Sequence, residues 1–194
     1  RTADLDEDGR LEVLTASNPN SSVSWYDQVE DGQSRDRTVI DNEALGVWTA
    51  IPVDVNQDGA PDIVAALGGS NEIQWYENDG ASTPTFTEYT VGMSSTLRDI
   101  AAGDLDGDGD PDVVAVLDGG SVIWFENQDG GAEEGGNLQF GESRLISTDM
   151  PDADAVAVGD IDGDGSLDVV TAASGNYTVA WHENPDASGG QWTT

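Results

Sequence analysis

The sequence predicts an all-β protein made of four-stranded antiparallel sheets that are arranged as the blades of a β-propeller. Three observations lead to this prediction. An acidic nine-residue loop recurs four times at nearly constant spacing, a short apolar run follows each loop, and a tryptophan-centred segment lies about twenty residues after each loop start. No segment has a helical hydrophobic period of useful length. The chain is therefore interpreted as about four copies of one supersecondary unit.

The acidic loop carries side-chain oxygens at positions 1, 3, 5 and 9 and glycine at position 6. Its copies begin at Asp4, Asp54, Asp104 and Asp160, so the repeat length is 50, 50 and 56 residues. A hard cation such as Ca²⁺ takes about 6–8 oxygen ligands at about 2.3–2.6 Å. Carboxylates this close together repel one another unless a cation lies among them. The sequence therefore predicts up to four bound Ca²⁺ ions whose binding contributes to folding.

The predicted ligands are the side chains at positions 1, 3, 5 and 9 and the backbone carbonyl at position 7. The full set is Asp4, Asp6, Asp8, Arg10 and Glu12, then Asp54, Asn56, Asp58, Ala60 and Asp62, then Asp104, Asp106, Asp108, Asp110 and Asp112, then Asp160, Asp162, Asp164, Ser166 and Asp168. Arg10, Ala60, Asp110 and Ser166 contribute carbonyls only. The glycine at position 6 is expected to turn with positive φ. Because Asn56 replaces an acid, we expect the second loop to bind calcium less tightly.

Two other interpretations of the acidic loop can be compared with calcium binding. A solvated acidic turn would suit one isolated copy, but four copies in the same phase disfavour it. An EF-hand needs a bidentate Glu at position 12 and flanking helices. Position 12 is instead occupied by Thr or Ala, and strands are expected to follow: Thr15, Ala65, Ala115 and Thr171. The EF-hand is therefore excluded.

Each repeat contains four strand signals in the same order. A small-residue strand precedes the loop, as at 100–103, and a continuous apolar strand follows it, as at 63–67. The tryptophan strand and a last strand, such as 85–91, come next. The four blades are predicted at approximately 1–46, 47–96, 97–152 and 153–194, within a single propeller segment covering 1–194. A Gly- and Glu-rich insertion at 128–137 lengthens the third interval.

The aromatic residues are predicted to serve packing rather than chemistry. A broad indole ring covers much area between blades, so Trp25, Trp75, Trp124 and Trp181 are expected to be packing residues rather than ligand-stacking residues. His182 stands where the other repeats carry an aromatic ring: Tyr26, Tyr76 and Phe125. It is accordingly predicted to be a packing residue, and no catalytic residue is assigned.

Composition narrows the classes of partner. The 194 residues carry 39 acids against six arginines, no lysine and no cysteine, for a net charge of −33. Such a surface would repel nucleic acid and anionic membranes. No apolar run approaches the ~18 residues of a membrane span, so no membrane insertion is expected. The 37% hydrophobic content still suffices for a core. The acidic excess favours a marine or halophilic source.

The loop, the apolar strand and segments such as Trp75-Tyr-Glu-Asn78 resemble the FG-GAP/VCBS-type repeat of integrin α-subunit propellers and of many secreted microbial and algal proteins. The resemblance covers essentially the whole chain. It implies calcium loops on one face of a propeller and usually about seven blades. We therefore expect a piece of a longer chain, or a ring completed by another copy. A closed four-blade ring is the alternative.

The leading functional hypothesis is an extracellular, calcium-stabilised module for adhesion or for protein or glycan interaction. Variable loops at 17–22, 68–71, 118–121 and 174–177 are expected on the face opposite the metal loops. Variation on a fixed scaffold is where binding specificity lies. Trp48 and Arg98 are candidate contacts there, although burial of Trp48 is favoured.

Two alternatives remain: a polysaccharide-active lyase or hydrolase, and a glycan-binding lectin. With one His and no Cys or Lys, acid–base chemistry would fall to carboxylates, Tyr or Arg, and no pair of carboxylates stands out. Two glycosylation sequons, at Asn20 and Asn176, are as many as chance predicts.

Overall fold

The computed structural model describes residues 1–28, 35–128, 140–175, 177–187, 189–190 and 192–193. Most of the predicted insertion and the sequon residue Asn176 lie outside these residues. The fold is all-β, as predicted, and the described residues contain no α-helix, only one 3₁₀ turn at Asn18–Asn20.

The fifteen strands among the described residues form four separate antiparallel sheets in chain order. The first sheet has β1 Thr2–Ala3, β2 Glu12–Ser17, β3 Ser22–Gln28 and β4 Arg35–Asp41; the second has β5 Val47–Val53, β6 Asp62–Leu67, β7 Glu72–Asn78 and β8 Phe86–Met93. The third has β9 Leu97–Gly103, β10 Asp112–Leu117, β11 Val122–Phe125 and β12 Arg144–Ser147; the fourth has β13 Ala153–Gly159, β14 Asp168–Ala173 and β15 Thr178–His182. Each sheet is a simple meander.

The acidic loops join the first two strands of every sheet. Position 9 of each loop pairs with the residue just before position 1, as in Gly103 with Asp112 and Gly159 with Asp168. The other two loops close in the same register, Ala3 with Glu12 and Val53 with Asp62. Because the register is common to all four, equivalent loop residues occupy equivalent places in each sheet.

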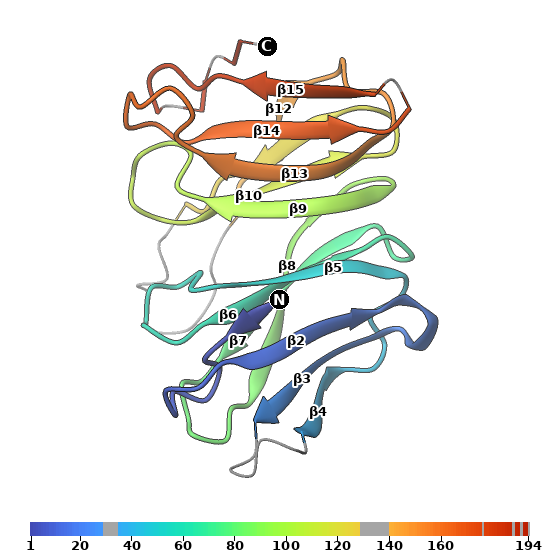
Figure 1. Cartoon of the computed structure of the whole chain (residues 1–194), viewed down its shortest axis with the longest axis vertical. Coiled ribbons are helices and arrows are strands. Elements are labelled where there is room, and N and C mark those ends of the chain that lie inside the picture. The colour runs from blue at the N-terminus through green and yellow to red at the C-terminus, as the bar shows by residue number, and fades with distance from the viewer. Residues whose placement is uncertain (29–34, 129–139, 176, 188, 191, 194) are drawn as a thin grey trace.

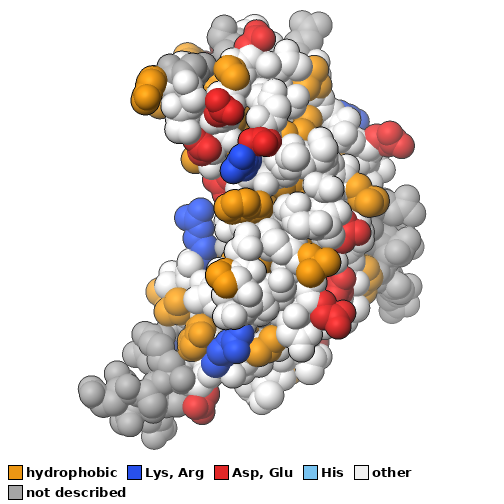
Figure 2. Space-filling model, turned by 90° about the vertical axis from the view of Figure 1, so that its right-hand side faces the viewer, with side chains coloured by type: hydrophobic (Ala, Val, Ile, Leu, Met, Phe, Trp, Pro, Cys, Tyr) orange, Lys and Arg blue, Asp and Glu red, His pale blue; other side chains and the backbone are white. Residues whose placement is uncertain are grey.

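The sheets follow one another along the long axis of the molecule (Figure 1). Strand β2 contacts β5, β5 contacts β9 and β9 contacts β13, so these strands of successive sheets lie side by side. The acidic loops lie at the left ends of the strands in Figure 1, and the loops between second and third strands lie at the right ends. Seen from the side, the molecule has a concave outline (Figure 2).

The core consists of three apolar clusters, each formed between two successive sheets. Trp25, Trp75 and Trp124 are 6%, 1% and 0% exposed, which confirms their predicted packing role. Trp181 is 40% exposed, so the prediction that it packs between blades was wrong for this residue. The physical reason is that no described sheet follows the fourth one to cover its ring.

His182 is fully buried, and its Nε2 lies 2.9 Å from Thr171 Oγ1. Burial lowers its pKa below the ordinary value of 6.5, because the charged imidazolium loses its hydration. The unfolded chain therefore takes up a proton first as the pH falls. The stability that the neutral imidazole provides is complete above pH 6.5 and is lost as the pH falls from there towards the lowered pKa.

As the pH falls from about 7.5 to about 5.5, the free energy of unfolding of His182→Phe should decrease less than that of the wild type. The reason is that phenylalanine does not titrate. Phe125 fills the same slot in the third sheet, so the ring should fit. Urea denaturation of both proteins in saturating calcium measures the difference. The same pH dependence in both proteins would contradict a neutral buried imidazole.

Candidate metal loops

The four acidic loops share one ladder of hydrogen bonds from the backbone to side chains. In the third loop, Gly109 N donates to Asp104 Oδ2 at 3.1 Å, Asp108 N to Asp106 Oδ1 at 3.3 Å, and Asp110 N to Asp108 Oδ1 at 2.9 Å. Equivalent bonds occur in the other three loops. The side chains at positions 3 and 5 therefore each use one oxygen to shape the loop.

Two residues of each loop adopt the left-handed conformation. The glycines at position 6 have the positive φ that the sequence predicts: Gly9 at 87°, Gly59 at 97°, Gly109 at 103° and Gly165 at 96°. Position 4 is also left-handed, which the sequence analysis missed: Glu7, Gln57, Gly107 and Gly163 have φ of 58°, 57°, 77° and 81°. Glycine at this position in two loops was the available signal, because glycine takes this conformation without strain.

The acid at position 9 has a structural role besides its predicted role as a ligand. Asp112 is fully buried, and its two oxygens accept bonds from Leu105 N and Asn127 N, both at 2.8 Å. Asp62 and Asp168 accept the equivalent pairs of bonds. Burial raises the pKa of Asp62 to about 6 and that of Asp112 to about 7, even though the bonded amides act in the opposite direction. Asp62, Asp112 and Asp168 thus each join the start of their loop to the segment at the end of the third strand, whereas Glu12 accepts a bond only from Leu5 N.

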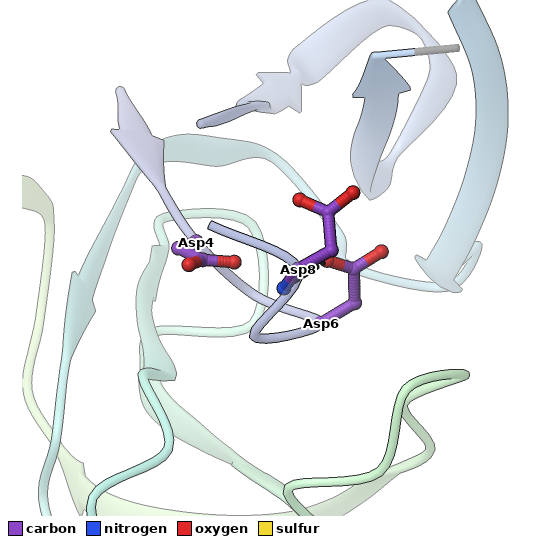
Figure 3. Close-up of side chains that lie close together, drawn as sticks. All are labelled: Asp4, Asp6 and Asp8. Carbon is purple, nitrogen blue, oxygen red and sulfur yellow. Dashed lines mark hydrogen bonds between the residues drawn. The ribbon is translucent and has the colours of Figure 1, made fainter. Parts of the chain in front are cut away.

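Three loops bring carboxylate oxygens within 4.8 Å of one another. The groups are Asp4, Asp6 and Asp8 in the first loop, Asp104, Asp106 and Asp108 in the third, and Asp160, Asp162 and Asp168 in the fourth. Figure 3 shows the first group on a single loop, with the Asp6 and Asp8 carboxylates side by side and that of Asp4 turned towards them. Such spacing suits one cation with oxygen ligands.

The second loop differs because Asn56 occupies position 3. Its Nδ2 donates to Asp58 Oδ2 at 3.0 Å and to Glu77 Oε1 at 3.2 Å. The amide group therefore relieves part of the repulsion that a bound cation would relieve in the other loops. Weaker calcium binding by this loop stays a prediction.

The loops contain anionic oxygens that lack a partner. Asp4 Oδ1, Glu12 Oε1 and Asp54 Oδ1 are buried and accept no hydrogen bond in the structure. Burial, followed by the charge of Asp108, raises the pKa of Asp106 to about 6. Buried charges are stable only when they are paired or bind metal. The donor set therefore fits a divalent cation of the calcium type.

The carbonyl ligands assigned to position 7 stay predictions. Of these residues the structure gives the bonds of the N–H groups: Arg10, Ala60, Asp110 and Ser166 donate N–H to the acid at position 5, at 2.8–2.9 Å. Arg10 Nη1 also lies 3.5 Å from Asp8 Oδ2, so one cation of the chain itself lies beside the first loop.

Comparison with known families agrees with this repeating geometry. The FG-GAP-like repeat matches residues 4–65, 54–115 and 104–171, and the FG-GAP repeat matches 153–191. Together these matches cover nearly the whole chain. The chain belongs to the FG-GAP repeat family. No curated protein matches it.

Among solved structures, the FG-GAP chain is similar to the crystal structure of the V. cholerae biofilm matrix protein Bap1, with a TM-score of 0.54 and 20% sequence identity. The match covers 96% of this chain and 26% of that chain, so the FG-GAP chain spans about a quarter of Bap1. At this identity the likeness concerns the fold. None of the described helical segments has the length and apolarity that crossing a bilayer requires.

Asparagine side chains link each FG-GAP repeat to the one before it, a feature that the sequence analysis missed. Asn78 Nδ2 donates to Leu5 O at 2.8 Å, Asn127 Nδ2 to Val55 O at 3.1 Å and Asn184 Nδ2 to Leu105 O at 2.7 Å. Each acceptor is position 2 of the preceding metal loop. The repeated Glu-Asn pair was visible in the sequence, but its partner lies 72–79 residues away. The loops are therefore structurally coupled to the next sheet.

On the opposite face, a small hollow lies between the second and third sheets. Trp48 is 52% exposed there, so the favoured expectation that it is buried was wrong. The Arg98 guanidinium lies 5.6 Å from the centre of the Trp48 ring and forms an ion pair with Asp118. Gly68, Thr96 and Leu97 complete the lining. Figure 2, which views the molecule from this side, shows hydrophobic and basic side chains among the acids.

Proposed function

We propose that the chain is a calcium-binding propeller module of an extracellular adhesion or matrix protein, which binds a glycan on the face opposite its metal loops. The observation that carries the proposal is that the two ends of the sheets carry different kinds of loop. All four acidic loops lie at one end of the sheets, and the variable loops lie at the other (Figure 1).

The propeller arrangement is supported by the way successive sheets pack. Each of the first three tryptophan strands is covered by the next sheet. Strands β2, β5, β9 and β13 contact one another in that order. Repeats of this kind bury a continuous core only by stacking. The curved outline in Figure 2 is what a part of a ring would present.

Calcium supports this module by supplying positive charge where buried carboxylate oxygens lack partners. When bound, the ion would neutralise the acids at positions 1, 3 and 5 of each loop, and its binding free energy would add to the folding free energy. The chain's own contribution is to hold these acids in place through the shared backbone ladder. Position 9 then connects each loop to its sheet.

An extracellular matrix or adhesion role is supported by the fold likeness to a biofilm matrix protein and by the family. The strongly acidic composition suits a surface that must stay soluble at high ionic strength. An enzymatic role on polysaccharides stays an alternative.

Glycan is the favoured ligand class because of the hollow at Trp48. A half-exposed indole offers an apolar plane for the C–H face of a sugar ring, and the Arg98–Asp118 ion pair offers donors and acceptors for neighbouring hydroxyls. A neutral sugar suits this site better than an acidic one, because the net charge of −33 repels anions.

We expect Trp48→Ala to weaken binding of neutral oligosaccharides by about tenfold or more, because exposed aromatic anchors commonly dominate binding energy. Calorimetric titration in millimolar calcium measures this. Met93→Ala is the matched control, since Met93 is 68% exposed and does not line the hollow. Turnover of the oligosaccharide would favour the enzyme instead. Equal binding by wild type and Trp48→Ala, or no binding at all, would reject the hollow as the glycan site.

A further inference from the structure

The turn that enters the third sheet holds a threonine in a conformation that threonine rarely adopts. Thr96 lies directly before β9 and has φ of 55°, in the left-handed region. A β-branched side chain is strained there, and such a residue persists only where the surrounding structure fixes it. The equivalent residue of the second repeat is Gly46, which has φ of 63° and takes this conformation without strain. The third repeat therefore carries a strained residue where glycine would suffice.

The backbone of Thr96 is held on both sides by hydrogen bonds. Its N–H donates to Asn71 Oδ1 at 3.0 Å, and its carbonyl accepts a bond from Asp118 N at 2.9 Å. Both bonds use main-chain atoms of Thr96, so a glycine at this position would keep them. Within the described residues, the structure shows no hydrogen-bond partner for the Thr96 hydroxyl. The turn itself thus does not depend on the threonine side chain.

The Thr96 side chain is exposed and lines the hollow at Trp48, together with Arg98 and Asp118. The position of the Trp48 ring is fixed by its neighbours. A Cβ atom at Gly68 would overlap Trp48 Nε1, so the edge of the indole lies against bare backbone, and the Arg98 guanidinium lies over the ring. Thr96 accordingly places a hydroxyl group beside a positioned apolar plane. Small-molecule sites combine these two features, an apolar surface and a few fixed polar groups.

The next junction along the chain shows that the fold does not require these side chains. Between the third and fourth sheets, the places of Trp48, Gly68, Thr96 and Arg98 are taken by four charged residues: Arg98, Asp118, Asp152 and Asp154. Asp152 has φ of 57°, and aspartate tolerates this conformation better than threonine does. The same backbone turn therefore occurs without an indole and without a threonine. The combination at the second junction serves the hollow rather than the packing of the sheets.

We propose that Thr96 is a specificity-determining residue of the hollow, whose hydroxyl hydrogen-bonds to a hydroxyl of the sugar that packs on Trp48. This inference rests on the proposed function, because it assigns a further contact in the same site. A threonine hydroxyl both donates and accepts, which matches the hydroxyl of a neutral sugar. The strain of the turn is then offset by a contact that is made only when the sugar is bound. Sites that bond a substrate hydroxyl discriminate strongly against analogues that lack it.

Three substitutions at this position separate the hydroxyl from the turn. Thr96→Ser keeps the hydroxyl and should bind sugar within about twofold of the wild type. Thr96→Val keeps the branched shape without the hydroxyl and should bind about fivefold or more weakly. Thr96→Gly should bind as weakly as Thr96→Val, yet its melting temperature should lie about 2 °C or more above that of the wild type, because the strain is gone. Binding and stability should thus change in opposite directions in the glycine variant.

Calorimetric titration in millimolar calcium measures binding to a panel of neutral oligosaccharides of glucose, mannose or galactose, and scanning calorimetry measures melting. Ser21→Gly is the matched control, since Ser21 has φ of 48° and does not line the hollow. It should raise the melting temperature and leave sugar binding unchanged. If Thr96→Val does not fold, Thr96→Ala replaces it, because alanine also lacks the hydroxyl.

Equal sugar binding by the wild type, Thr96→Val and Thr96→Gly would overturn the inference. The proposed function would survive that result, provided that Trp48→Ala still loses binding. A wild type that binds no member of the panel would reject both the glycan site and the role of Thr96. A glycine variant that is no more stable than the wild type would also overturn the inference, because Thr96 would then carry no strain for a ligand contact to offset.

Discussion

Removal of calcium by a chelator should lower the melting temperature of the wild-type chain by about 10 °C or more. One site at about 100 times its dissociation constant contributes about 2.7 kcal/mol, and each kcal/mol shifts the midpoint by about 2–4 °C in a domain of this size, so one site gives about 5–11 °C and several sites give more. The physical cause is that buried oxygens such as Asp4 Oδ1 and Asp54 Oδ1 have no other partner. Differential scanning calorimetry with and without calcium measures the shift.

Magnesium is the control for ionic strength and simple charge screening. It is smaller than calcium and demands stricter octahedral geometry, so it should restore less of the midpoint at equal concentration. A melting temperature that does not respond to chelator would contradict the calcium proposal. It would leave the repeat fold intact.

Asn127→Ala should destabilise the chain by about 2–4 kcal/mol both with calcium and in chelator. Asn127 is fully buried, and its amide group donates to Val55 O and Pro111 O. The substitution leaves these carbonyls without that donor and creates a small cavity. It should also loosen the second metal loop, to which Val55 belongs. Urea denaturation measures the change in unfolding free energy.

Asp106→Asn is the matched comparison, because it changes a metal loop without removing a link between sheets. It should weaken the chain in calcium, where a ligand charge is lost. In chelator it should be neutral or slightly stabilising, because burial and the charge of Asp108 already disfavour the ionised acid. If Asn127→Ala mattered only with calcium, or Asp106→Asn mattered equally in both conditions, the separation of structural and metal-binding roles would be wrong.

Much of the candidate site could be predicted from the sequence because it is local. Asp104 and Gly109 lie five residues apart, and their hydrogen bond and the positive φ of the glycine follow from the spacing within one loop. The strands after the loops were equally predictable, since β6 and β10 are continuous apolar runs buried at every position. The second role of position 9 was not predictable, because one of its two partner amides, such as Asn127 N for Asp112, lies 15 residues further along the chain.

The solvent exposure of individual side chains could not be predicted from the sequence. Trp48 and Trp75 are the same residue type in the same repeat, yet one is 52% exposed and the other 1%. Likewise Trp181 and Trp124 occupy equivalent places in the third strands of their sheets, yet one is 40% exposed and the other 0%. These differences depend on what another part of the chain places nearby.

The repeat, the all-β strand order and the four acidic loops can be predicted from the sequence alone, since alternating strands and nine-residue turns arise from contacts between near neighbours in the chain. How the repeats are joined and which aromatic rings stay exposed depend on the packing of the sheets. Those features depend on contacts such as Asn184 with Leu105, 79 residues apart, which form only after the sheets have packed.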